Sequence, residues 1–97
     1  MTKSRVAKLL QEWEALRGQA GSLRSREIAA FAQKLGRKRH NRGKEPTYVS
    51  TLLEWRHPIS IPNHPGDMGK GLAIKILNDL RDDLDELREI ASQGDLR

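Results

Sequence analysis

The side chains of this chain that could bind phosphate are concentrated in one tract. The stretch KLGRKRHNRGKEPTYV, residues 34–49, has six Lys or Arg and one His among its first eleven residues. Such a tract is typical of a surface that meets phosphate, because neutralising phosphates releases counterions and supplies affinity. The alternative is a solvated basic surface without a ligand. The candidate RNA-binding residues are Arg37, Lys38, Arg39, His40, Arg42 and Lys44, with Lys70 near the start of the last predicted helix.

Cleavage chemistry beside this tract has only weak candidates. A metal-free ribonuclease needs a group that titrates near neutral pH, and histidine is the usual choice. His40 lies within the tract and Glu45 follows it, but the surrounding cations favour the charged form of Glu45, which suits a turn carboxylate better than a general base. We assign no catalytic residue. The histidines lack close metal-ligand spacing, so we expect no metal site and no cofactor.

The tract must be positioned by a small α+β domain. Apolar spacing predicts a helix over residues 4–17 and a second helix, capped by Ser25, that ends at Gly36. Three short antiparallel strands follow, in RKRHN, TYVSTLL and ISI, and a long helix runs from Gly71 to about Ser92. The predicted fold is a three-stranded antiparallel sheet packed on helices in the order α-α-β-β-β-α. One sheet face, or the basic edge, is left for a ligand.

The last predicted helix carries an apolar stripe that includes Leu77, Leu80, Leu84 and Leu87. The helix is longer than a three-stranded sheet needs for cover, so part of the stripe must pack elsewhere. Two partners remain open: the N-terminal helix of the same chain, or a second copy of the chain.

The two tryptophans differ in their settings. Trp13 fits the stripe of the first helix, as a core or interface residue. Trp55 lies in a basic hairpin loop, where it can stack on an unpaired base or fold back over a thin core.

Composition limits the class of protein. At 97 residues with a net charge of +5, the chain suits a single domain. Residues 1–70 hold 14 Lys or Arg against 6 acids, whereas residues 71–97 hold 4 against 7. The chain has no cysteine and shows neither a membrane-length apolar run nor an export signal, so we expect a cytoplasmic protein without membrane contact.

An ordered set of motifs gives a more specific interpretation. KLG at residues 34–36 leads into the basic strand, Gly43 occupies the following turn, PNH spans residues 62–64, and GDMGKG at residues 66–71 precedes the last helix. In this order and spacing, residues 25–80 resemble the HicA family, also called YcfA-like, of small toxins from toxin-antitoxin pairs. The resemblance implies a fold like a double-stranded RNA-binding domain, and an association with messenger RNA cleavage or with an antitoxin. The family-matched turn residues are Gly43, Pro62, His64, Gly66 and Gly71.

The chain departs from this family where the family's cleavage chemistry is expected. Aligning Gly43 with the glycine of the family's G-S-H turn puts Lys44 at the serine and Glu45 at the histidine. No catalytic histidine carries over. The additions are a helix over residues 1–18 and an extension of the last helix over residues 81–97.

Two hypotheses of different class follow. The first is a HicA-like RNA-binding protein of toxin-antitoxin type without the usual messenger RNA interferase histidine. The second is an interaction module that dimerises, or docks on another protein, through its acidic last helix.

Overall fold

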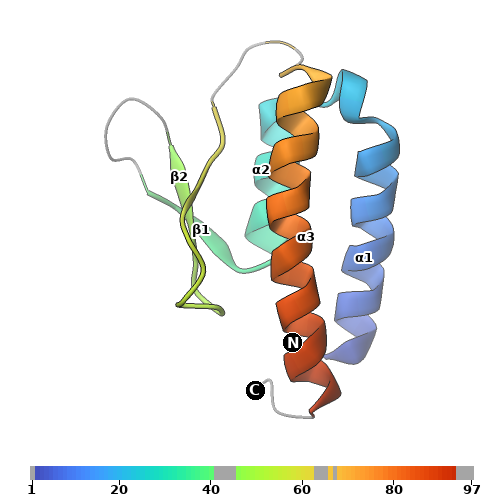
Figure 1. Ribbon diagram of the computed structural model, residues 1–97, viewed down its shortest axis with the longest axis vertical. Coiled ribbons are helices and arrows are strands. Elements are labelled where there is room, and N and C mark those ends of the chain that lie inside the picture. Colours follow the sequence, from blue (N-terminus) through green and yellow to red (C-terminus); the bar gives the residue numbers. More distant parts are fainter. Residues whose placement is uncertain (1, 41–45, 63–65, 67, 94–97) are drawn as a thin grey trace.

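The computed structural model describes residues 2–40, 46–62, 66 and 68–93. Within them the chain forms three α-helices, one short 3-10 helix and one three-stranded sheet (Figure 1). The elements are α1 (Lys3–Gly18), η1 (Ala20–Ser22), α2 (Ser25–Lys34), β1 (Arg37–His40), β2 (Thr47–Ser50), β3 (Ile59–Ser60) and α3 (Lys70–Ser92). The predicted α+β class and element order are confirmed.

Local chemistry explains the ends of the first two helices. The Thr2 hydroxyl accepts a hydrogen bond from the Arg5 backbone N–H at 3.1 Å, which caps α1. Ser25 does not cap α2 as predicted, because it is already helical. Arg24 is the N-cap, and its N–H donates to the Glu27 carboxylate at 3.3 Å. Gly36 follows the end of α2 with a φ of 89°, which L side chains rarely adopt.

The sheet has the order β1-β2-β3, and both pairs of neighbouring strands are antiparallel. Arg39 is opposite Tyr48, which in turn is opposite Ile59. Tyr48 and Ile59 are buried, so this row of residues lies on the inner face of the sheet. The short strands therefore contribute only a few side chains to the core, and the helices supply most of it.

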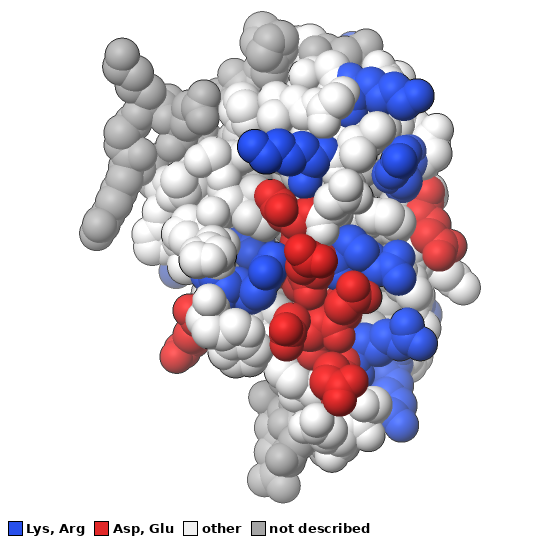
Figure 2. Space-filling model, in the orientation of Figure 1, with Lys and Arg blue, Asp and Glu red and all other residues white. Residues whose placement is uncertain are grey.

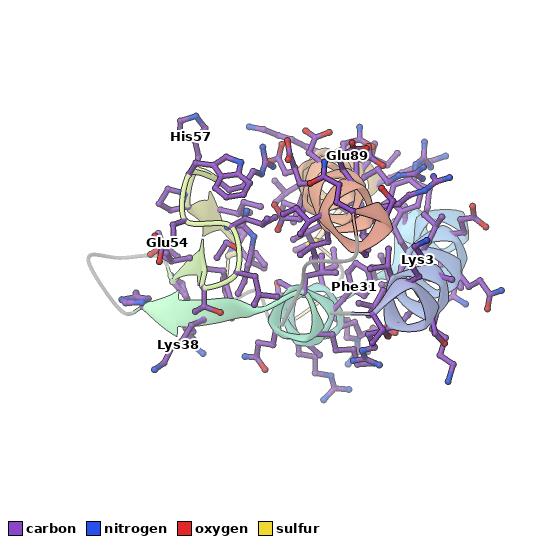
Figure 3. The ribbon with its side chains drawn as sticks, turned by 90° about the horizontal axis from the view of Figure 1, so that it is seen from below. Lys3, Phe31, Lys38, Glu54, His57 and Glu89 are labelled. Carbon is purple, nitrogen blue, oxygen red and sulfur yellow. The ribbon has the colours of Figure 1, made fainter. Side chains whose placement is uncertain are left out.

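The helices α2 and α3 cover the inner face of the sheet, and no described helix covers its outer face (Figures 1 and 3). Phe31 of α2 and Leu80 of α3 are almost fully buried in the core that these helices form. The two helices begin at the same end of the molecule, where the Met68 N–H donates to the Leu23 carbonyl at 3.1 Å. They then run in the same direction (Figure 1).

The helix α1 packs on the side of the helical layer that is farthest from the sheet (Figures 1 and 3). Its Val6 and Leu9 are buried, and the Trp13 indole N–H donates to the Leu77 carbonyl of α3 at 2.6 Å. The Arg81 guanidinium lies 5.0 Å from the centre of the Trp13 ring, in cation–π geometry. Trp13 is therefore a contact between helices of the same chain.

This packing corrects the predicted dimer or partner face. The four leucines proposed for it are at most 2% exposed: Leu77, Leu80, Leu84 and Leu87. They are part of the chain's own core, so they offer no apolar seam to a second copy. The intramolecular alternative for the stripe is correct. No helix in the described part of the chain is both long enough and apolar enough to cross a membrane.

Candidate nucleic-acid interface

The basic strand β1 divides its side chains between the two faces of the sheet. Successive residues of a strand point to opposite sides, so Arg37 and Arg39 share the inner face while Lys38 and His40 share the outer face. Lys38, Arg39 and His40 are exposed, whereas Arg37 is buried. The four residues therefore cannot act as one surface.

Arg37 is not available to RNA. The residue is 2% exposed, and its Nε and Nη2 donate to the two carboxylate oxygens of Asp83 at 2.6 and 2.8 Å. Its Nη1 donates to the backbone carbonyls of Tyr48 and His57, at 2.7 and 3.1 Å. Every nitrogen of the guanidinium is thus engaged inside the protein. Including Arg37 among the phosphate-binding residues was wrong, because a carboxylate of the same chain already neutralises it.

A second arginine completes this buried cluster. Arg56, in the loop between β2 and β3, donates from Nε to Asp83 Oδ1 at 2.9 Å and from Nη2 to the Asp79 carbonyl at 3.0 Å. Burial by itself lowers the pKa of the Arg56 guanidinium. Its hydrogen bond and attraction to Asp83, with the attraction of Asp82 and Asp79, outweigh burial, so the pKa is raised. Arg56 stays charged and ties its loop to α3.

Sequence reasoning missed this cluster, although one signal was present. Asp83 comes three residues after Leu80 and four before Leu87, so a helix places it on the apolar stripe rather than on the charged face. A carboxylate there needs a cation from another element, because a buried charge without a partner is very costly. The sequence does not identify that cation, since Arg37 is 46 residues away.

Lys38 of β1 points to the opposite side of the molecule from a column of acids. Figure 2 shows acidic side chains gathered along α3, whose outward residues include Asp82, Asp85, Glu86 and Glu89. Figure 3 shows Lys38 and Glu89 pointing to opposite sides. A polyanion that approaches β1 from the Lys38 side therefore avoids the acids of α3.

A cleft of about 230 Å³ opens between α2 and the sheet. The wall from α2 carries Arg26 and Gln33, and the other wall carries Arg39 of β1. Among the described residues that line it, none is acidic: Ser25, Arg26, Ala29, Ala30, Gln33, Arg39, Pro46, Tyr48, Ile61 and Pro62. Two guanidinium groups in the described lining favour an anionic ligand. Arg26 and Gln33 were not among the predicted site residues.

Several predicted residues lie outside the part that the structure describes: Arg42, Gly43, Lys44, Glu45 and His64. Of the remaining turn and helix-start residues, Pro62 lines the cleft, while Lys70 and Gly71 are exposed in the first turn of α3. Gly66 is half-buried.

The described residues do not form a recognisable cleavage centre. His40 ends β1 opposite Thr47, whereas His57 precedes β3 at the other end of the sheet. The two histidines therefore cannot act as an acid–base pair. Within the described ranges, no group of three or more His, Cys, Asp or Glu is placed to hold a metal ion.

Trp55 does not fold back over the core, because it is 61% exposed. Its loop is nevertheless held at several points. The Thr51 N–H and hydroxyl both donate to the Gly36 carbonyl, at 2.9 and 2.6 Å, and Arg56 binds α3 beside it. Stacking of Trp55 on an unpaired base stays a prediction.

No protein-family model matches the chain, and no curated protein or solved structure matches it.

Proposed function

We propose that this chain is a HicA-like RNA-binding protein of toxin-antitoxin type, with an antitoxin protein as its partner. The observation that carries the proposal is the pair of exposed arginines, Arg26 and Arg39, on opposite walls of a cleft between α2 and the sheet. Lys38 and His40 add exposed positive charge on the outer face of β1, and Lys38 points away from the acids of α3. Such a surface gives affinity to phosphate without dependence on sequence.

The residues that the structure describes support RNA binding rather than RNA cleavage. The family's histidine has no counterpart at residue 45, and His40 and His57 lie at opposite ends of the sheet. The proposal is therefore RNA binding without messenger RNA interferase activity. Arg37 is not part of the binding surface. We assign RNA contacts to Arg26 and Arg39 in the cleft and to Lys38 and His40 on the outer face of the same edge strand, with Lys70 at the start of α3.

The proposal is tested by measuring RNA affinity at a series of salt concentrations. We expect the double variant Lys38→Glu/Arg39→Glu to bind labelled RNA at least tenfold more weakly than the wild type. Its plot of log affinity against log salt should be shallower by about 1.4, since each phosphate contact to a single strand contributes about 0.7 to the slope.

A matched control reverses two exposed cations elsewhere. Arg5→Glu/Lys8→Glu changes the net charge equally but lies on α1, on the far side of the helical layer from the sheet. We expect it to retain most of the affinity and the slope. Equal losses in both double variants would show that net charge alone attracts RNA, and no binding by the wild type would refute the proposal.

A further inference from the structure

The cleft between α2 and the sheet combines charged, polar and apolar lining residues. Arg26 and Arg39 stand on opposite walls, and the Gln33 amide can both donate and accept hydrogen bonds. The remaining lining is mostly alanine, proline and larger apolar side chains: Ala29, Ala30, Pro46, Tyr48, Ile61 and Pro62. A ligand that satisfies every part of this lining needs an anionic group, a polar edge and an apolar face.

We infer that the cleft holds one unpaired nucleotide of RNA. Its base lies against the alanines and prolines, the Gln33 amide meets the edge of the base, and its phosphate lies between Arg26 and Arg39. This inference rests on the proposed RNA-binding function and specifies which feature of RNA the chain binds. An unpaired base exposes its hydrogen-bonding edges and its ring face, which a paired base in an RNA helix does not.

The size of the cleft agrees with one nucleotide of a polymer. Its volume of about 230 Å³ is below the roughly 300–1,000 Å³ of pockets that enclose a whole small-molecule ligand. Ala29 and Ala30 supply the smallest side chains on their wall, which leaves room for a flat ring to enter. The rest of the RNA would stay outside the cleft and pass around the edge of β1, whose outer face carries Lys38 and His40.

The same cleft is less suited to an acidic peptide. A carboxylate and a phosphate can each meet two guanidinium groups, as Asp83 does, so the apolar part of the lining decides between them. An Asp or Glu side chain brings no flat ring to the surfaces of Ala30 and Pro62. This part of the lining favours the nucleotide.

The test fills the cleft without changing its charge. Ala30 is exposed, so Ala30→Phe adds a ring in the opening while the core stays unchanged. The matched control is Ala15→Phe, at an exposed alanine of α1. We expect Ala30→Phe to weaken binding of a single-stranded RNA about tenfold, the order that one base contributes to binding, because the added ring takes the space of that base. Affinity for a fully paired RNA duplex of the same length should change less than twofold, and the control should change neither.

The outcomes separate this inference from the proposed function. Suppose that the wild type binds RNA and that Ala30→Phe weakens the binding of single-stranded and duplex RNA equally, or weakens neither. The inferred nucleotide site is then wrong, while the RNA-binding proposal stands. If the wild type binds no RNA, both fail.

A second measurement identifies the ligand directly. We expect uridine or adenosine monophosphate, titrated into the isotope-labelled wild type, to shift the NMR signals of Ala30, Gln33 and Tyr48, and this shift to be lost in Ala30→Phe. Shifts of these signals by an acidic peptide and not by a nucleotide would overturn the inference and assign the cleft to a protein partner.

Discussion

Arg37 and Arg39 are two residues apart on one strand and face the same side of the sheet, yet they have opposite surroundings. Arg37 meets Asp83 of α3 and is buried, whereas Arg39 is exposed and lines the cleft beside α2. The strand gives both side chains the same direction. The element across from each one decides whether the arginine holds the fold together or meets the solvent and its ligands.

Removing Asp83 should have the largest effect on stability, because Asp83 is the partner of the buried arginine, Arg37. Asp83→Ala leaves the Arg37 guanidinium buried without its carboxylate and removes one bond of Arg56. We expect a loss of about 3–5 kcal/mol in the free energy of unfolding. Urea denaturation measures it.

Two further variants show whether the charge is the cause. Asp82→Ala removes a neighbouring exposed carboxylate, and its cost should stay within about 0.5 kcal/mol. The double variant Arg37→Met/Asp83→Leu replaces the pair by apolar side chains and should be more stable than Asp83→Ala. A cost for Asp83→Ala as small as that for Asp82→Ala would contradict the cluster's role.

Outside the buried cluster, Gly36 should have the next largest effect on stability, because it directs the chain from α2 into β1 just before Arg37. A Cβ at this position would lie 2.7 Å from Leu52 Cδ1, and the φ of 89° strains any L side chain. Leu52 is 39% exposed and can move aside, so we expect the backbone to dominate a cost of about 2 kcal/mol for Gly36→Ala.

The contributions to this cost can be separated. Adding Leu52→Ala to Gly36→Ala should recover little stability if the backbone dominates. Gly71→Ala is the control, since nothing lies within 4 Å of its Cβ position and helical Ala is more stable than Gly by up to about 1 kcal/mol. Thermal unfolding should therefore shift in opposite directions for the two glycines.

Arg56→Ala measures how much of the stability of the cluster comes from its partly exposed arginine. Arg56→Ala removes the bonds to Asp83 and to the Asp79 carbonyl, but Arg37 still neutralises Asp83. We expect a cost of about 1–2 kcal/mol, smaller than that of Asp83→Ala.

The pH dependence of the Arg56 contribution has a definite sign. A basic group with a raised pKa stabilises the fold fully below its unfolded pKa and loses that contribution only as the pH rises through its folded pKa, far above neutral pH. The difference in unfolding free energy between the wild type and Arg56→Ala should therefore be equal at pH 6 and pH 9. If this difference in unfolding free energy decreased from pH 6 to pH 9, the Arg56 guanidinium would not keep its charge over that range.

The features set by local periodicity were predictable, whereas those set by distant contacts were not. Apolar spacing located all three helices, and the change to β-branched residues located the strands. The same patterns could not say that the stripe of α3 meets α1, because an apolar seam looks alike whether its partner is the same chain or a copy. The burial of Arg37 depends on a carboxylate 46 residues away. The cleft joins α2 to the ends of strands through residues such as Ala30 and Gln33, whose types carry no signal alone.

The smallest expected effect on stability is at the exposed arginine, Arg39. Arg39→Ala should change the free energy of unfolding by less than about 1 kcal/mol, since the side chain is exposed. Arg37→Ala should cost about 3 kcal/mol or more, because it leaves Asp83 buried with only Arg56 as its partner. RNA binding of the folded variants should be weakened by Arg39→Ala at unchanged stability. Similar losses of stability for both variants would show that Arg39 is also part of the scaffold and would remove the distinction between the two arginines.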